Sequence, residues 1–136
     1  MRKIAFSKRE EELMDFMWKY GEPLTAMEIL EKCEEHSWSD HYLRVMLRSL
    51  ERKGVIAFDS LEQRRSQYAR RFRTTISREE YYVKLAEEGG VNADLFAKTA
   101  VVALMRGSAS EDKEELLKKL EEIIVDFKAE DDKTWG

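Results

Sequence analysis

Apolar residues recur at the spacing of an α-helix in three successive stretches of the first half of the chain. The stretches run from 8 to 20, from 26 to near 33–36, and from 40 to 53, and a Ser or Thr able to cap a helix stands before each. After Ser7 and Thr25 a Glu follows three residues later, which is the capping-box pattern. Three helices in this order, with a short connection between the second and third, are typical of a helix-turn-helix.

Beyond the third stretch the period changes from that of a helix to that of short strands. Residues 55–58 form an apolar run of strand type, and residues 67–72 alternate between two faces. The polar stretch 61–66 between them has no Asn-Gly or Asp-Gly pair, so we expect a long, mobile loop rather than a tight turn. The two strands and this loop would form the wing of a winged helix.

The second half of the chain shows three more helical stretches, at 77–88, 94–106 and 110–127. The middle stretch is apolar almost all round, and a segment this small buries little core by itself. Its apolar faces therefore need a partner, either the winged helix or a second copy of the chain. We favour a second copy, because dimers place two reading helices in successive major grooves about 34 Å apart. The residues expected to make the dimer are Leu95, Val101, Val102, Met105, Leu116, Leu120, Ile123, Ile124 and Phe127.

These patterns predict a mainly α-helical chain with a small β-hairpin. A winged helix-turn-helix DNA-binding domain would cover residues 1–76, and a helical dimerisation segment would cover residues 77–136.

Charge is distributed unevenly along the chain. The net charge is −4, but residues 44–73 hold nine basic and three acidic residues. A basic patch confined to a helix-turn-helix and its wing indicates double-stranded DNA as partner. We expect base contacts from His41, Tyr42 and Val45, and guanine or phosphate contacts from Arg44 and Arg48. The full set of expected DNA-contacting residues is His41, Tyr42, Arg44, Val45, Arg48, Arg52, Arg64, Arg65, Arg70 and Arg71.

Composition argues against several other classes of protein. Cys33 is the sole cysteine and there are two histidines, so neither an intramolecular disulfide nor a usual zinc site is expected. The sequence has no Gly-rich phosphate loop and no nucleophile–base pair, so we expect neither an enzyme nor a bound cofactor. No apolar run reaches about 18 residues and the first residues lack a signal-peptide pattern, so we expect a cytoplasmic protein without a membrane segment.

An ordered set of residues resembles the penicillinase-repressor family over roughly 7–127. The residues that resemble its third helix and strand entry are Trp38, Ser39, Leu43, Met46, Leu47, Leu50, Lys53, Gly54, Val55 and Ile56. Those that resemble its first two helices are Leu13, Met14, Trp18, Gly21, Met27, Glu28 and Ile29. Residues 76–81 are similar to its entry into the dimerisation segment. The resemblance implies a homodimeric repressor that binds a palindromic operator.

The chain departs from the family pattern where the known branches sense their signals. In the β-lactam branch an Asn-Phe bond is cleaved after a membrane sensor is triggered, but the sole asparagine here, Asn92, precedes Ala93. The copper branch uses paired C-terminal Cys-x-Cys motifs, whereas this chain has only Cys33. The resemblance therefore identifies neither an inducing signal nor an upstream sensor or protease. Tyr42 and Val45 replace residues common in the family's reading helix and predict a different operator.

Two other interpretations stay open. One is a winged-helix regulator of another family, with a ligand pocket at its dimer interface. The other is a winged-helix adaptor that binds proteins, which would not need the arginines of the third helix and the wing.

Overall fold

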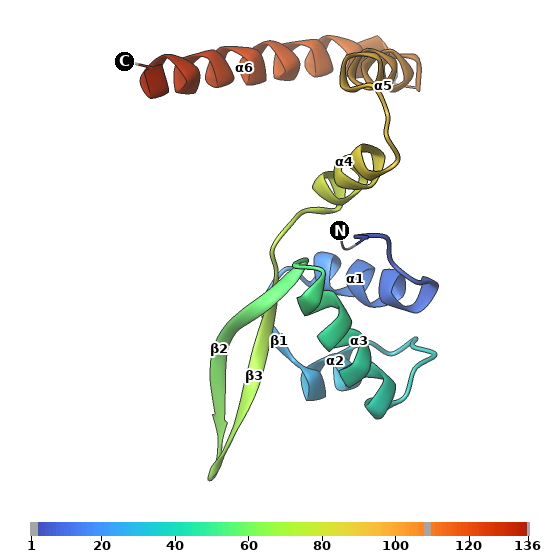
Figure 1. Cartoon of the computed structure of the whole chain (residues 1–136), viewed down its shortest axis with the longest axis vertical. Helices are drawn as coiled ribbons and strands as arrows, with labels where there is room; N and C mark the ends of the chain where they lie inside the picture. Colours follow the sequence, from blue (N-terminus) through green and yellow to red (C-terminus); the bar gives the residue numbers. More distant parts are fainter. Residues whose placement is uncertain (1–2, 108–109, 136) are drawn as a thin grey trace. The chain divides into compact units, whose positions relative to one another are not determined.

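The computed structural model describes residues 3–107 and 110–135 and divides into two compact units, Met1–Gly90 and Val91–Gly136. Figure 1 shows the elements of both units. The helices are α1 (Lys8–Tyr20), α2 (Ala26–Lys32), α3 (Asp40–Arg52), α4 (Arg78–Glu88), α5 (Ala93–Gly107) and α6 (Ser110–Trp135). The strands are β1 (Leu24–Thr25), β2 (Ile56–Arg64) and β3 (Gln67–Thr74). The expected class, mainly helical with a small sheet, is confirmed.

Each of the first three helices begins directly after its predicted cap. The Ser7 hydroxyl accepts a hydrogen bond from the Glu10 N–H, and the Glu10 carboxylate accepts one from the Ser7 N–H. Thr25 and Glu28 form the same reciprocal pair at the start of α2. These bonds satisfy N–H groups that have no partner within the helix. Gly21 ends α1 with φ 78°, a left-handed conformation that glycine adopts without steric cost.

A single apolar core holds the first unit together. It draws on all three N-terminal helices and on the sheet. The core residues are Leu13, Met14, Met17, Leu24, Ile29, Cys33, Trp38, Leu43, Met46, Leu47, Leu50, Val55, Ile56 and Phe72. The stripe that α3 contributes to this core leaves its opposite face, with the arginines, in solvent.

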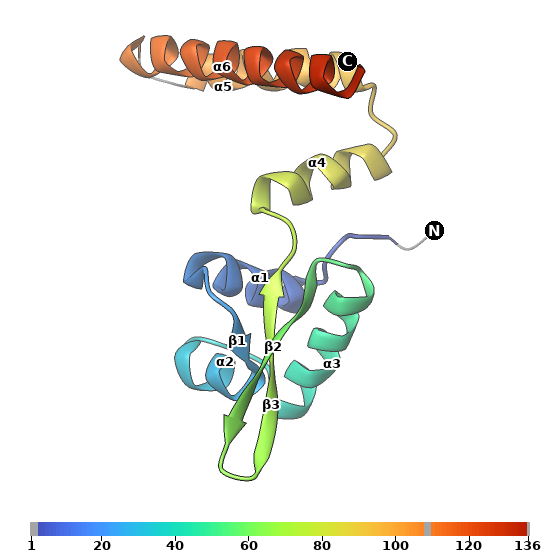
Figure 2. The same ribbon diagram turned by 90° about the vertical axis from the view of Figure 1, so that its left-hand side faces the viewer.

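The sheet has three antiparallel strands in the order β1-β3-β2, and Figure 2 shows the long β2–β3 ribbon reaching past the helices. β1 is absent from the sequence prediction, because two residues are too few to show a strand period. Leu24 lies opposite Phe72 and Thr25 opposite Arg71 in the ladder. This short strand fixes the start of α2 against the base of the wing.

The prediction of a long loop at the wing tip is wrong. β2 runs through residues 61–64, and only Arg65 and Ser66 separate it from β3. Arg65 has φ 56°, so a residue other than glycine takes the left-handed position that a tight hairpin turn demands. The polar stretch continues as strand because its side chains pair across the ribbon, a context that intrinsic strand propensity does not include.

The second unit comprises α5 and α6. None of the α5 residues is buried within the chain. Leu95 and Ile123 are each 61% exposed, and Ile124 is 54% exposed. The side chain of Phe127 lies outside the described residues. The expectation that the apolar helix near 94–106 is buried is thus not met within one chain.

Candidate nucleic-acid interface

The exposed face of α3 carries half of the residues predicted to contact DNA. His41, Arg44, Val45 and Arg48 are all exposed and lie opposite the buried stripe. Arg52, one turn beyond Arg48, is exposed as well. Ser39 caps this helix by accepting a hydrogen bond from the Tyr42 N–H, so its first turn is well formed at the end that would reach base edges.

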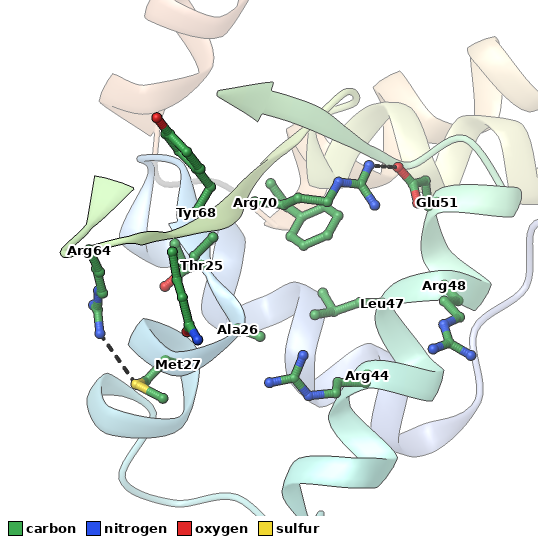
Figure 3. A pocket seen from close by; sticks show the side chains of 13 residues that line it. Thr25, Ala26, Met27, Arg44, Leu47, Arg48, Glu51, Arg64, Tyr68 and Arg70 are labelled. Atoms are coloured by element: carbon green, nitrogen blue, oxygen red, sulfur yellow. Dashed lines mark hydrogen bonds and ion pairs between the residues drawn. The ribbon is translucent and has the colours of Figure 1, made fainter. Parts of the chain in front are cut away.

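A cleft of about 520 Å³ separates α3 from the wing and the start of α2. Figure 3 shows its lining side chains. Of the predicted set, the cleft brings together Arg44, Arg48, Arg64 and Arg70. Two cations come from α3 and two from the wing, so the cleft is a basic concavity on the face where the sequence places DNA contacts.

Arg70 does not face solvent freely. Its Nη2 lies 2.9 Å from Oε2 of Glu51 on α3, and its guanidinium lies 5.3 Å and 5.0 Å from the ring centroids of Phe58 and Phe72. This arginine therefore joins the wing to α3 in addition to contributing charge to the cleft.

The other acidic residues of the basic window also pair with wing arginines. Glu62 lies 3.4 Å from Arg64 and 3.8 Å from Arg71, and Asp59 lies 3.8 Å from Arg73. With Glu51, all three acids between residues 44 and 73 are engaged in this way. The positive charge of the wing is thus partly neutralised within the molecule.

Two predicted cations have no such counter-charge. Among the residues that the structure describes, neither Arg48 on α3 nor Arg65 at the wing tip forms an ion pair, whereas Arg44 pairs with Asp40 at 3.3 Å on the helix surface. A cation without an internal partner contacts a phosphate or a base without first breaking a contact of its own.

Tyr42 and Arg71 lie apart from the cleft. Tyr42 is half-buried against the core, with the Arg9 guanidinium 5.1 Å from the centroid of its ring. Arg71 follows Arg70 in β3, and successive strand residues point to opposite faces. Burial alone would raise the pKa of Glu28, but hydrogen bonds from the N–H and hydroxyl of Thr25, followed by the charges of Arg71 and Lys32, together lower it.

Comparison with known protein families identifies the family of the chain. The model of the penicillinase repressor family matches residues 6–124 of the 136-residue chain. The chain belongs to the penicillinase repressor family. Members of this family are transcriptional regulators rather than enzymes, and repressors of this kind bind DNA. No curated protein matches the chain.

Sequence reasoning missed several residues that line the cleft, and three of them either contact its arginines or are widely exposed. Glu51 is the counter-charge of Arg70, Met27 places its sulfur 3.3 Å from Nη1 of Arg64, and Tyr68 is 64% exposed on the wing. Tyr68 shares the alternation of residues 67–72, which is the one signal that could have found it. The contacts of Glu51 and Met27 depend on the strand register, so the local sequence pattern around these residues does not predict them.

Among the described residues, no group of three or more His, Cys, Asp or Glu side chains is placed to hold a metal ion. Cys33 is buried, and burial together with the carboxylates of Glu12 and Glu35 raises the pKa of its thiol. No described helix has the length and apolar character needed to cross a membrane.

Proposed function

We propose that this member of the penicillinase repressor family binds a palindromic operator as a homodimer and thereby represses transcription. The observation that carries the proposal is the exposed, arginine-bearing face of α3 beside the wing. Helix-turn-helix proteins insert such a face in the major groove, and the wing adds contacts to the backbone.

We assign some of the exposed residues to contacts with base edges and others to contacts with phosphates. His41 and Val45 lie toward the start of the helix and are the residues we assign to base edges. Arg48 is the best candidate for a bidentate contact with guanine, because it is exposed and, among the described residues, has no ion pair. Arg44, Arg64 and Arg65 suit phosphate contacts. Tyr42, Arg52, Arg70 and Arg71 complete the proposed set, with smaller contributions from the residues that already have partners.

The second unit supplies the proposed dimer contacts. Its apolar side chains are widely exposed in the single chain, and monomeric soluble proteins rarely leave so much apolar surface in one place. A second copy provides an identical surface, and a two-fold axis makes it self-complementary. The residues assigned to this contact are Leu95, Val101, Val102, Met105, Leu116, Leu120, Ile123, Ile124 and Phe127.

The residues used in the two induction routes named by the family resemblance are missing from this sequence. Asn92 precedes Ala93, so there is no Asn-Phe bond to cleave. Instead the Asn92 side chain accepts a hydrogen bond from the Leu95 N–H at 3.0 Å, at the start of α5. This asparagine therefore has a structural task as a helix cap.

Selection of bound duplexes from a random library tests the proposal. The expected result is one enriched motif with two inverted half-sites, and one protein dimer per duplex in sedimentation. Enrichment without inverted symmetry, or a single chain per duplex, would refute the homodimeric mode. No enrichment at low salt would refute DNA recognition and favour the adaptor interpretation.

A further inference from the structure

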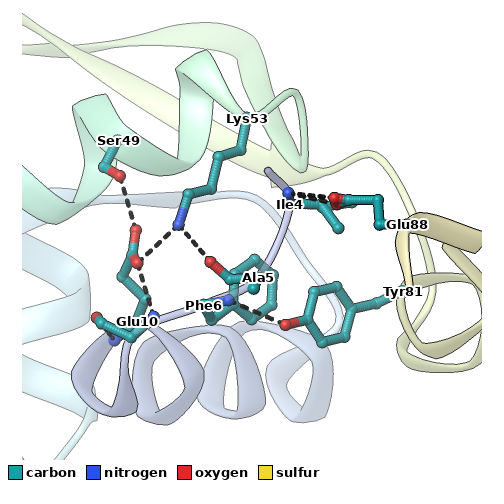
Figure 4. A network of polar contacts seen from close by, with 9 residues as sticks. Ile4, Ala5, Phe6, Glu10, Ser49, Lys53, Tyr81 and Glu88 are labelled. Carbon is teal, nitrogen blue, oxygen red and sulfur yellow. Dashed lines mark hydrogen bonds and ion pairs between the residues drawn. The ribbon is translucent and has the colours of Figure 1, made fainter. Parts of the chain in front are cut away.

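Residues 4–6 lie along α4 and bind it at two places, as Figure 4 shows. The Phe6 N–H donates a hydrogen bond to the Tyr81 hydroxyl at 3.0 Å, and the two rings stack with centroids 4.0 Å apart and planes 5° from parallel. The Ile4 N–H donates to both carboxylate oxygens of Glu88, at 2.6 and 2.9 Å. Tyr81 and Glu88 are two helical turns apart, so the contacts grip α4 over most of its length.

The opposite side of the same segment is bound to the end of α3. Lys53, the C-cap of α3, donates a hydrogen bond from Nζ to the Ala5 carbonyl at 2.8 Å. The same ammonium pairs with Glu10 at 2.9 Å and lies 5.7 Å from the centroid of the Phe6 ring. The Lys53–Glu10 pair is mostly buried, with side chains 17% and 8% exposed. Residues 4–6 are thus sandwiched between α4 and the helix that we assign to DNA reading.

The start of α4 has an attachment of its own. The Trp18 indole N–H donates to the Ile76 carbonyl at 2.9 Å, and Arg78 pairs with Asp15 at 3.2 Å. Without residues 4–6, α4 would therefore be anchored at its first turn only. It would be free to pivot there, because residues 82–88 make no other hydrogen bond, ion pair or ring contact with another element in the described part of the chain.

We propose that residues 4–6 are a strap that holds α4 on the DNA-reading unit, with Phe6, Tyr81 and Glu88 as positioning residues for operator binding. The strap fixes the point, at Gly89 and Gly90, from which the chain leaves for the second unit. In the proposed homodimer, on which this step rests, the position of that point sets the spacing between the two DNA-reading helices. A pivot of about 20° at the first turn would move the far end of an 11-residue helix by roughly 5 Å. That exceeds one base-pair step of roughly 3.4 Å.

Distance measurements between two spin labels test the strap without DNA. The labels go on cysteines at Gln63 on the wing and Lys84 on α4, in a Cys33→Ser background, with excess unlabelled chain so that only distances within one chain are seen. We expect one narrow distribution, broadened about twofold or more by Phe6→Ala with Glu88→Gln, since the far end of α4 is then released. The matched control Glu87→Gln, one residue from Glu88, leaves it narrow. An unchanged distribution in the folded double variant would overturn the strap.

Milder variants keep this test decisive if the double variant unfolds. Tyr81→Phe removes only the hydroxyl that accepts from the Phe6 N–H, and Glu88→Gln removes only the charge of the acceptor. Each variant is expected to broaden the distribution of the distance between the labels. The variant that combines both substitutions must broaden it if the strap holds α4. Thermal unfolding of each variant confirms that the winged helix itself is intact.

Operators with a changed distance between their half-sites test whether the strap positions the protein for operator binding. One base pair added between half-sites should weaken binding of the parent protein by about tenfold, because protein or DNA must deform to restore both contacts. The same insertion should weaken binding of the strap variants by about threefold or less, because the released α4 can adjust to the new distance between half-sites. Equal losses would refute the positioning role. If the parent binds no selected duplex, the proposed function fails, while the label distances still decide whether the strap exists.

Discussion

Arg70 in β3 and Glu51 on α3 form an ion pair at 2.9 Å, although 19 residues separate them in the sequence. The arginine also lies over Phe58 and Phe72, so one side chain connects the helix, the wing and the aromatic base of the ribbon. The pair places a carboxylate inside a cleft that otherwise carries the arginines assigned to DNA. It orients the wing, and it also withholds one positive charge from phosphate.

Glu51→Gln should therefore release Arg70 for contact with phosphate. Binding to a scrambled duplex should strengthen, and the slope of log K against log salt should steepen by about 1, the change expected for one added phosphate contact. Titrations at several salt concentrations measure the slope. Glu79→Gln, an exposed acid outside the cleft, is the matched control and should leave the slope unaltered. The same slope in both variants would mean that Arg70 stays on the aromatic rings.

Arg48→Ala should weaken operator binding and relax selectivity by about 1–3 kcal/mol, the cost of losing a bidentate base contact. Anisotropy titrations with operator and scrambled duplexes give both quantities. Lys19→Ala, which removes an exposed cation of α1, should change neither. An equal loss on both duplexes would make Arg48 a phosphate contact instead.

Ile123→Asp should dissociate the proposed homodimer. An unpaired carboxylate in an apolar interface costs about 2 kcal/mol or more, which raises the dissociation constant about thirtyfold. Sedimentation velocity over a range of concentrations gives this constant. Lys118→Asp makes a charge change on the same helix but at a polar position, and should have little effect. A variant at Ile123 that sediments as the parent does would show that this stripe lies outside the interface.

Glu10→Gln should destabilise the winged helix by about 1–3 kcal/mol at pH 7, because the carboxylate is buried and bonded to Ser7, Ser49 and Lys53. Burial alone would raise the Glu10 pKa, but the Ser7 N–H, the Lys53 and Ser49 side chains and the Lys53 charge together lower it. A carboxyl group with a lowered folded pKa contributes its stability above the unfolded value of about 4.3, and loses it as the pH falls through the folded value.

Urea unfolding of parent and variant between pH 7 and pH 3 checks this dependence. The difference in unfolding free energy should be constant down to about pH 5 and shrink below about pH 4. Glu11→Gln, at an exposed neighbouring position, should show no such difference. If the difference in unfolding free energy stayed the same at pH 3, the packing of the Glu10 side chain rather than its charge would account for its contribution to stability.

The helices of the winged domain are predictable because their signals are local. Ser7 with Glu10, and Thr25 with Glu28, cap helices through groups three residues apart, and the stripe from Leu43 to Leu50 identifies the inner face of α3. The outward face follows from the same stripe, so exposure of His41, Arg44, Val45 and Arg48 is predictable as well.

The remaining features depend on contacts between distant segments. β1 is a strand only because Leu24 and Thr25 meet β3. The tight wing turn exists because residues 60–64 pair continuously with residues 67–71. The attachment of α4 to the first unit depends on Phe6 and Tyr81, which are 75 residues apart. The boundary expected at residue 76 lies before α4, whereas the first compact unit extends through Gly90. The dimerisation role assigned to residues 77–136 stays a prediction.

Fluorescence-anisotropy titration of the selected duplex beside a scrambled duplex, at two salt concentrations, tests sequence-specific DNA binding most directly. We expect tight binding to the selected duplex, weaker binding to the scrambled one by about a thousandfold, and a steep loss of affinity for both as salt rises. Equal affinity for the two duplexes at both salt concentrations would contradict the account, because phosphate contacts alone would then explain all binding.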